Sequence, residues 1–567
     1  RSEEETTTDD ENGESDTTVT EDSSQEDTGE TQEETTTEDE TKEEKDSEKD
    51  SIVIEPSKYD TYTMPNEPVM ELAETDFNKG FQTLLENDAR LANNMGELEA
   101  QWDNSKYFTE VKNQNPYGTC WAHAAIGLME YSLKKQNIME NPDLSEHHLA
   151  YFAYNTGYDV LGNASKDTIT CSKTGADLYN MGGNYWLAAN RLLNWQGAAG
   201  EAGYPYSNMP GKIASDKAQD TVAILKNCYF IPTKDVVTGS DNDKKLQLRN
   251  LLKTLIKEYG GVMWSYNHQR AYMHDVIKDG EKESTNYYSG TKLTGTNHAI
   301  EVVGWDDNYS RENFPEDCRP ENDGAWLIRN SWGTSIGKDG YMYMSYEERT
   351  LGCSNSASVY IAGNKSDYDN NYFYDNVVSN SLPSIGSLNK IAAVYDVKNT
   401  VEQLKAVSSI SAAADVNYSI QIYKLDADGT VSNPEKGTAL LSEPVTGKVA
   451  YSGVYTVELG KSIYLQQNDK FAIVVSFPGK NGKMYISPSG TSDGVSVYDD
   501  CAQGQMFINS GSSWSDCGKD SSPYSFNLNA LTKDVDISSI DVTLSVYRQK
   551  PEGLNGELVN KLSCNNI

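Results

Sequence analysis

The sequence predicts an α+β protein in which a helix-containing region precedes an antiparallel β-sandwich. The first observation is an Ala-, Leu- and Met-rich stretch, residues 121–133, which is typical of a helix. The second is a change of texture after about residue 370, where short β-type runs alternate with turn residues up to about residue 535. At 567 residues, the chain is long enough for several domains.

Residues 1–51 are expected to form a disordered acidic spacer. Glu, Asp, Thr and Ser fill this tract, and Val19 is its one bulky apolar residue. Such a composition cannot bury enough apolar surface to offset chain entropy. The whole chain has a formal net charge of −38, so we expect no nucleic-acid partner because phosphates would be repelled.

Residues 52–99 are expected to hold an extended piece, 52–56, and then a helix over about 76–98 with apolar spacing. The sequence has no run of about 18 apolar residues, which predicts that this chain carries no transmembrane segment. The chain begins at Arg1 rather than Met, and we expect that an upstream segment such as a signal peptide has been removed.

Cys120 is the candidate nucleophile. Pro116 and Gly118 make the preceding residues loop-like, so Cys120 falls at the N-terminus of the helix predicted at 121–133. There the unpaired N–H groups and the positive end of the helix dipole favour a thiolate over a thiol. A thiolate nucleophile needs a proton partner, and it needs hydrogen-bond donors for the oxyanion that its attack creates.

Three further side chains complete the candidate site. Gln114, six residues before Cys120, is the candidate oxyanion donor. Far downstream, His298 offers an imidazole and Asn330 an amide that can orient it. The local strings are Gln-Asn-Pro-Tyr-Gly-Thr-Cys-Trp, Asn-His-Ala-Ile-Glu-Val-Val-Gly-Trp and Ile-Arg-Asn-Ser-Trp-Gly.

In these residues, their order and their local strings, the sequence resembles the papain-like cysteine proteases over roughly residues 100–350. The resemblance implies a two-lobed catalytic domain, one lobe helical and one β-barrel-like, that hydrolyses peptide bonds without a cofactor. It gives the oxyanion, nucleophile, general-base and orienting roles to Gln114, Cys120, His298 and Asn330. Residues 52–99 then take the place of an inhibitory pro-region, with a helix merely packed on the catalytic domain as the alternative.

The resemblance also implies which residues contact substrate. Gly182 and Gly183 match a pair beside which a substrate backbone lies extended, and an ordinary tight turn is the alternative. Tyr266, at the end of a buried strand predicted at 260–266, is expected to border a side-chain pocket, and Ala299 to contact substrate. Trp332 is expected to shield the bond between His298 and Asn330.

Several departures from the family pattern point to its bacterial, Gram-positive cell-surface branch and so to an extracellular location. Tyr117 and Met181 stand where plant and lysosomal relatives have disulfide cysteines. Asn297 replaces the Asp that commonly precedes the catalytic His, and an insertion at about 306–323 separates the His and Asn strings.

The other histidines are expected to be structural. Ser145 is expected to cap a helix whose first turn contains His147 and His148. Neighbouring residues on a helix do not face one another, so we expect these two histidines to form no metal site. His123 lies one turn from Cys120, where many relatives carry Phe, and is expected to be a packed, hydrogen-bonded histidine.

The C-terminal part divides into a linker at 351–370, the β-sandwich at 371–535 and a tail at 536–567. The strings at 372–375 and 504–509 resemble the lectin-like domain attached to some clostridial surface cysteine proteases. This resemblance implies cell-wall carbohydrate as a partner and leaves a structural calcium ion open, with no ligands assigned. Residues 426–429 read as a hairpin turn.

Besides Cys120 there are seven cysteines, which cannot all pair within the chain. Cys318 with Cys353 and Cys501 with Cys517 are candidate bridges because they are near in sequence, and free thiols are the alternative. A transglutaminase or cell-wall amidase would also use Cys and His, but these enzymes usually orient the base with Asp or a second His. We expect a secreted endopeptidase acting on surface or extracellular proteins, with a catalytically silent surface adhesin as the non-enzymatic alternative.

Overall fold

A computed structural model describes residues 52–57, 77–93, 96–354, 356–378, 383–426, 429–539, 542–548 and 557–564 of the chain. The spacer predicted for residues 1–51 lies outside this part, as do two residues of the turn predicted at 426–429. None of the helices in the described ranges is long and apolar enough to cross a membrane.

The helix predicted to follow the Gln114 loop is confirmed as α3, and Cys120 is its first residue. The single helix predicted over 76–98 is instead two helices, because the carboxylate of Asp88 accepts a hydrogen bond of 3.0 Å from the N–H of Arg90 and starts a new helix. The α-helices of the described residues are α1 (Phe77–Asn87), α2 (Ala89–Asn93), α3 (Cys120–Lys135), α4 (Glu146–Tyr154), α5 (Ala176–Tyr179), α6 (Tyr185–Leu193), α7 (Lys234–Thr238) and α8 (Asn242–Tyr259).

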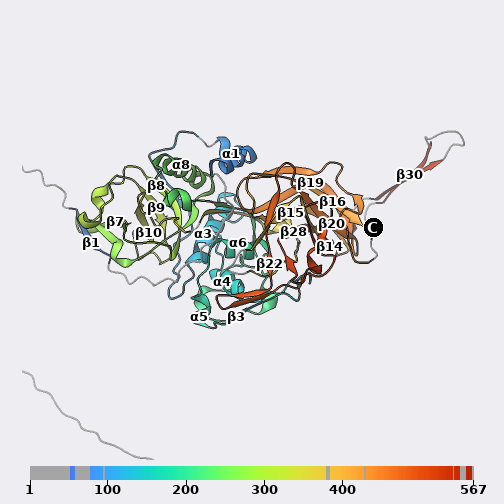
Figure 1. Cartoon of the computed structure of the whole chain (residues 1–567), viewed down its shortest axis with the longest axis horizontal. Coiled ribbons are helices and arrows are strands. Elements are labelled where there is room, and N and C mark those ends of the chain that lie inside the picture. The colour runs from blue at the N-terminus through green and yellow to red at the C-terminus, as the bar shows by residue number, and fades with distance from the viewer. Residues whose placement is uncertain are drawn as a thin grey trace, which may run out of the picture. The chain divides into compact units, whose positions relative to one another are not determined.

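The β-lobe of the catalytic domain is one stretch of a long mixed sheet. Its strands, in spatial order, are β1 (Val53–Pro56), β6 (Met273–Lys278), β7 (Glu281–Tyr287), β10 (Tyr341–Ser345), β9 (Ala325–Arg329), β8 (His298–Asp306), β5 (Val262–Tyr266), β11 (Ala357–Asn364) and β4 (Ala223–Ile231), with β2 (Gln101–Asp103) on β8. β5 is buried throughout, as predicted. Helix α3 contacts β8 on one side and α6 on the other (Figure 1).

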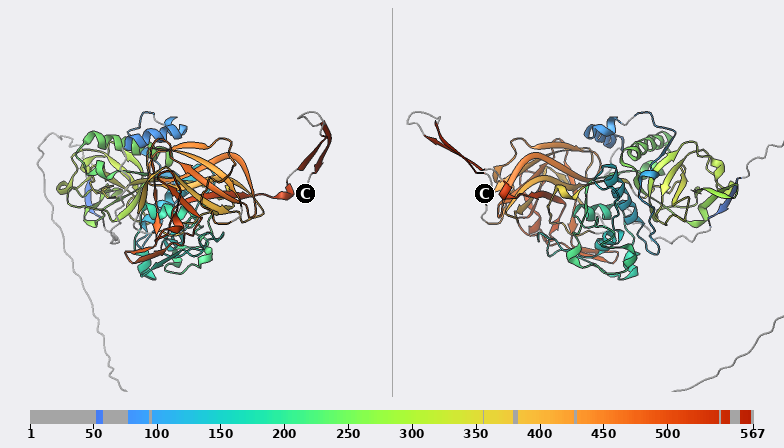
Figure 2. Two further views of the ribbon diagram at one scale, coloured as in Figure 1. Left: turned by 45° about the vertical axis from the view of Figure 1, so that its right-hand side comes forward. Right: turned by 180° about the vertical axis from the view of Figure 1, so that it is seen from behind.

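The predicted β-sandwich is confirmed, and its strands are drawn in yellow, orange and red in Figure 2. One of its sheets continues the catalytic sheet through β19 (Gly453–Gln466), β15 (Val401–Ser411), β21 (Gly482–Tyr485), β13 (Ser384–Leu388), β28 (Leu528–Asp534) and β12 (Asn370–Tyr372). The other holds β14 (Lys390–Asp396), β16 (Val416–Leu425), β17 (Gly437–Ala439), β18 (Val445–Val449), β20 (Lys470–Ser476), β25 (Met506–Asn509) and β26 (Ser515–Asp516).

Three small sheets complete the described strands. They are β22 (Ser487–Pro488) with β27 (Tyr524–Ser525); β23 (Gly490–Ser492), β24 (Val495–Tyr498) and β3 (Thr168–Cys171); and β29 (Val542–Arg548) with β30 (Glu557–Cys564). The last pair lies within the C-terminal tail expected at 536–567.

The linker expected at 351–370 contains a central strand of the catalytic domain. β11 pairs with β4 along its whole length and also contacts β5. Its Val359 and Tyr360 are buried on opposite faces of the sheet, so the strand belongs to the hydrophobic core. The catalytic domain therefore extends to residue 364, and the boundary predicted at 350 was too early.

The two domains share backbone pairing and core. Gly453 and Val454 of β19 lie opposite Tyr229 and Cys228 of β4. A Cβ atom on Gly453 would lie 2.0 Å from the carbonyl oxygen of Cys228, so only glycine allows this approach. The sandwich is therefore joined to the catalytic domain as a continuation of its sheet.

Helix α1 contacts both domains. Its Phe77 and Phe81 are buried in the same cluster as residues of α8 and Tyr451. The hydroxyl of Tyr451 donates a hydrogen bond of 2.5 Å to the carbonyl of Phe77, and its ring leaves no room for a Cβ on Gly80. This burial favours the packing-helix alternative for the region, and a pro-region role stays a prediction.

The seven cysteines whose side chains the structure describes are all free thiols. The bridges considered between Cys318 and Cys353, and between Cys501 and Cys517, are therefore not formed here, and the free-thiol alternative holds for these residues.

Candidate active site

Cys120 lies at the start of α3, next to the first residues of β8. Its side chain is only 4% exposed, and its sulfur accepts a hydrogen bond of 3.5 Å from the backbone N–H of Ala299. The backbone N–H groups of the first helical turn have no partners within a helix, so the sulfur sits where negative charge is stabilised.

His298 and Asn330 are brought together from two neighbouring strands. His298 begins β8 and Asn330 directly follows β9; Nε2 of His298 lies 2.9 Å from Oδ1 of Asn330. The same oxygen accepts a 2.8 Å hydrogen bond from the N–H of Ser331, which fixes the orientation of the amide. Nε2 therefore carries the proton, and the other ring nitrogen, Nδ1, has no hydrogen-bond partner in the described structure.

Burial lowers the pKa of His298 to about 4, although the bond to Asn330 acts in the opposite direction. The imidazole is therefore neutral at neutral pH, with a lone pair on Nδ1. A neutral imidazole of this kind can accept a proton from a nearby thiol.

Trp332 covers this pair. Its ring stacks on the His298 ring with centroids 4.6 Å apart and planes 12° apart, and its side chain is 4% exposed. The indole lies directly against the imidazole that bonds Asn330, and the shielding role of Trp332 stays a prediction.

Gln114 is fully buried, and its amide is held at both ends. Nε2 donates to the carbonyl of Tyr117 at 2.9 Å, and Oε1 accepts from the hydroxyl of Ser331 at 2.7 Å. The backbone of Gln114 also donates to the carbonyl of Ser331 at 2.8 Å. The loop before Cys120 is thus tied to the residue after Asn330.

The Gly182–Gly183 pair has reasons within the protein to be glycine, and its contact with a substrate backbone stays a prediction. A Cβ on Gly183 would lie 2.3 Å from the Trp121 ring, so this glycine is required by packing inside the protein. Gly182 has a φ of +77°, which favours glycine, and its carbonyl accepts a 2.7 Å hydrogen bond from Tyr154. Close approach of a substrate is therefore not needed to explain either glycine.

Tyr266 and Ala299 are both buried. Tyr266 lies opposite His298 in the pairing of β5 with β8, and its hydroxyl lies 2.9 Å from Nδ1 of His268. Tyr266 is 0% exposed, and its ring meets the His298 ring edge-to-face with centroids 5.7 Å apart, so the pocket role expected of it stays a prediction. Ala299 contacts the site through its backbone N–H.

A buried ion pair connects the three elements that carry the site. Arg329, just before Asn330, pairs with Glu301 of β8 at 2.5 Å. Gly127 of α3 packs on this pair, since a Cβ there would lie 2.1 Å from the Glu301 carboxylate. Removing one partner of such a pair typically costs about 3–5 kcal/mol because the other charge stays buried.

Two residues that the sequence analysis did not assign belong to this neighbourhood. Ser331 bonds Gln114, and it lies inside the Ile-Arg-Asn-Ser-Trp-Gly string, which could have pointed to it. His268 packs on Trp332 with ring centroids 4.7 Å apart, and no sequence motif indicates it. His123 is buried as expected, with Nδ1 2.9 Å from the carbonyl of Thr119.

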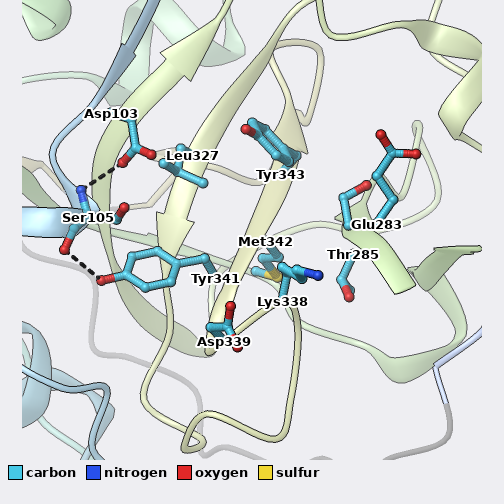
Figure 3. A pocket seen from close by; sticks show the side chains of 11 residues that line it. Asp103, Ser105, Glu283, Thr285, Leu327, Lys338, Asp339, Tyr341, Met342 and Tyr343 are labelled. Atoms are coloured by element: carbon cyan, nitrogen blue, oxygen red, sulfur yellow. Dashed lines mark hydrogen bonds between the residues drawn. The ribbon is translucent and has the colours of Figure 1, made fainter. Parts of the chain in front are cut away.

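A separate cavity of about 270 Å³ lies on the strands of the catalytic sheet (Figure 3). Ser105 donates to Asp103 there and accepts a 3.4 Å hydrogen bond from Tyr341. None of the predicted site residues lines it; its walls are Asp103, Ser105, Glu283, Ser284, Thr285, Leu327, Lys338, Asp339, Tyr341, Met342 and Tyr343. In the residues that the structure describes, no group of three or more His, Cys, Asp or Glu side chains is arranged to hold a metal ion.

The fold and the site define a cysteine protease of the papain type. Residues 98–361 match the model of the papain family of cysteine proteases, and residues 372–532 match that of the lectin-like domain. Residues 98–361 are therefore a papain-type cysteine protease domain, and residues 372–532 are a lectin-like domain.

Two solved structures of Cwp84 are similar to most of this chain. One, the clostridial cysteine protease after propeptide cleavage, is 25% identical with a TM-score of 0.59 and covers 77% of this chain and 100% of its own. The other holds the protease and lectin-like domains of Cwp84, a surface layer associated protein of Clostridium difficile. It is 22% identical with a TM-score of 0.60 and covers 84% of this chain and 100% of its own.

Fruit bromelain from Ananas comosus is 24% identical over 262 residues, which is 46% of this chain and 56% of bromelain. The chain thus spans little more than half the length of this curated relative, and the match is confined to about half of the chain.

Proposed function

We propose that this chain is an endopeptidase in which Cys120 is the nucleophile, His298 the general base and acid, and Asn330 the residue that orients His298. The observation that carries the proposal is the 2.9 Å contact between His298 and Asn330, which the Trp332 ring covers. The next residue of the His298 strand, Ala299, donates its backbone N–H to the Cys120 sulfur.

In the first half of the reaction, the Cys120 sulfur attacks the carbonyl carbon of the scissile bond and its proton passes to Nδ1 of His298. A C–S bond forms, and the carbonyl oxygen becomes an oxyanion. The backbone N–H of Cys120 and the second N–H of the Gln114 amide donate to this oxygen. When the C–N bond breaks, His298 gives its proton to the leaving amine and a thioester remains.

In the second half, water attacks the thioester while His298 takes one of its protons. The C–S bond then breaks, the carboxylic acid leaves, and the proton returns to Cys120. Trp332 keeps solvent away from the bond between His298 and Asn330, so the imidazole keeps one orientation through both halves.

The proposal is tested with the full chain and a fluorogenic peptide that is blocked at both ends, which only an endopeptidase can cleave. We expect the wild type to cleave it and Cys120→Ala to lose cleavage while keeping its fold. His148→Ala, a buried histidine on α4 whose ring bonds the carbonyl of Lys217, serves as the control and should keep activity. A wild type that cleaves nothing, or a Cys120→Ala variant that cleaves at the wild-type rate, would overturn the proposal.

We further infer an extracellular, cell-surface location on a Gram-positive bacterium, with surface proteins as substrates. This is supported by the similarity to a surface layer associated protein and by the lectin-like domain. The domain is proposed to bind cell-wall carbohydrate, and a structural calcium ion in it stays a prediction. Sedimentation of the full chain with purified cell walls tests the carbohydrate binding, and adding EDTA tests the calcium ion. If the chain keeps both its binding and its thermal stability in EDTA, the calcium prediction is wrong.

A further inference from the structure

A second histidine lies beside the candidate catalytic histidine. His268 follows β5 and is 6% exposed. Its ring centroid is 6.2 Å from that of His298 and 4.7 Å from that of Trp332, in an edge-to-face arrangement with both. Trp332 thus contacts both imidazoles: it stacks on His298, and His268 meets it at an angle of 67°.

Both the ring and the backbone of His268 are fixed by neighbours of His298. Nδ1 of His268 lies 2.9 Å from the hydroxyl of Tyr266, the residue opposite His298 in the sheet. The side chain of Asn297 accepts from the N–H of His268 at 2.7 Å and donates to its carbonyl at 3.1 Å. An Asp at this position could accept the first bond but could not donate the second, so the amide suits this clamp.

His268 lies against Trp332 at the edge of the His298 site and is itself buried. If the His268 ring were absent, Trp332 would lose its edge contact and a space would open next to the imidazole of His298. The titratable groups around His298 are His123 from α3, Tyr266 from β5 and His268 itself, and Cys120 from α3 contacts the backbone N–H of the next residue, Ala299. Burial also lowers the pKa of His268 well below its ordinary value, so the two imidazoles are both neutral at neutral pH.

We propose that His268 is a positioning residue for His298: clamped by Asn297 and Tyr266, it holds Trp332 stacked on the imidazole and keeps that face dry. The expected effect of His268 on kcat rests on the proposed function. Its structural consequence, the dry environment of His298, is measurable without any peptide hydrolysis.

The first experiment measures the pKa of His298 by NMR, using the full chain with labelled histidines in a Cys120→Ser background. Burial sets this pKa to about 4. His268→Ala should admit water and raise the pKa of His298 by at least about one unit toward its ordinary value of about 6.5. His268→Phe keeps a ring against Trp332 and should leave the pKa near 4, as should the remote control His148→Ala.

A pKa of His298 that stays near 4 in His268→Ala would overturn the proposal, as would an equal rise in His148→Ala. If His268→Ala does not fold, Asn297→Ala takes its place, because it removes the two bonds that Asn297 makes to the backbone of His268 and leaves every ring intact. The same rise is expected there, and an unchanged pKa counts equally against the proposal.

The second experiment compares kcat and KM on the blocked peptide with Cys120 restored. His268→Ala should lower kcat on the order of 10-fold with little change in KM, because a loosened imidazole is misplaced more often at the moment of proton transfer. His268→Phe should recover most of the loss. If the wild type cleaves nothing, the proposed function fails, while the NMR result still decides the role of His268.

Discussion

The hydroxyl of Ser331 donates a hydrogen bond of 2.7 Å to Oε1 of Gln114, which fixes the direction of the Gln114 amide. Ser331 directly follows Asn330, and its backbone N–H bonds the Asn330 side chain. One residue therefore orients both the amide proposed to stabilise the oxyanion and the amide that orients His298.

Gln114→Ala should lower kcat on the order of 10²–10³-fold with little change in KM, because one donor to the oxyanion is lost. Ser331→Ala should lower kcat less, since Gln114 remains but its amide is no longer held in one direction. Steady-state kinetics on a blocked peptide checks both changes. A wild-type kcat for Gln114→Ala would remove this residue from the mechanism.

Cys120 should be alkylated by iodoacetamide faster than the other described cysteines, and alkylation should remain fast in mildly acidic buffer. The helix N-terminus stabilises its thiolate, and the neutral imidazole of His298 can take up the proton that the thiol loses, whereas burial raises the pKa of Cys228, and that of Cys517 to about 12. Peptide mapping across pH 4 to 9 follows the labelling, with His298→Ala as the comparison. The acidic part of the profile should largely vanish in that variant; a wild-type rate that rises only near about pH 8.5, as for a free thiol, contradicts an activated thiolate.

His123→Phe should make the protein more resistant to acid. Burial lowers the pKa of His123 to about 3, so the folded state keeps it neutral while the unfolded chain protonates it below about pH 6.5. Wild-type stability is therefore lost as pH falls from about 6.5 toward 3, by about 2 kcal/mol at pH 5 for this residue. The Tm of the variant minus the Tm of the wild type should be larger at pH 5 than at pH 7.5. Loss of the hydrogen bond to Thr119 lowers the Tm of the variant equally at both pH values. A Tm difference that is the same at pH 7.5 and pH 5 would therefore show that His123 does not cause the loss of stability in acid.

Gly183→Ala should destabilise the protein by about 1–3 kcal/mol, because its methyl group would overlap the Trp121 ring and press on the start of α3. Peptidase activity should fall with it, since Trp121 adjoins Cys120. Gly200→Ala is the matched control, because a Cβ there meets nothing within 4 Å. Urea unfolding measures both variants. Equal midpoints for the two would show that the Trp121 contact tolerates a side chain.

A chain cut after residue 364 should not give a stable catalytic domain. The cut leaves β4 without its partner β19 and removes Ile410, Val454 and Tyr485 from the core cluster that also contains Trp121. We expect aggregation or a strongly lowered Tm in thermal denaturation, relative to the full chain. A soluble fragment with the Tm of the full chain would mean that the two domains fold independently.

The parts of the site that lie in local strings could be predicted from the sequence. The loop before Cys120 and the Ala-rich run after it place the thiol at a helix start, and the structure has that helix begin at Cys120. His298 and Asn330 each lie in a sequence string that resembles the family, and the structure places their side chains 2.9 Å apart.

Other features depend on contacts between distant segments, which no local pattern encodes. His268 contacts Asn297 and Trp332 from two distant segments, so only the register of the sheet brings it to the site. Gly183 is glycine because of Trp121, which the chain packs against it from another helix. Strand β11 was read as a linker because it follows the last family string, and its burial between β4 and β5 is a property of the assembled sheet.

The continuous sheet also sets how the molecule responds to mechanical load. Gly453 and Val454 of β19 pair with β4, and the N–H of Phe230 donates a 2.9 Å hydrogen bond to the carbonyl of Ser452 at the same junction. A pulling force that separates the two domains must break these backbone hydrogen bonds and expose the cores on both sides. The resistance is therefore that of a hydrogen-bonded sheet and not that of a flexible linker. Tension applied to the sandwich is thereby transmitted to β4, whose other neighbour is the catalytic strand β11.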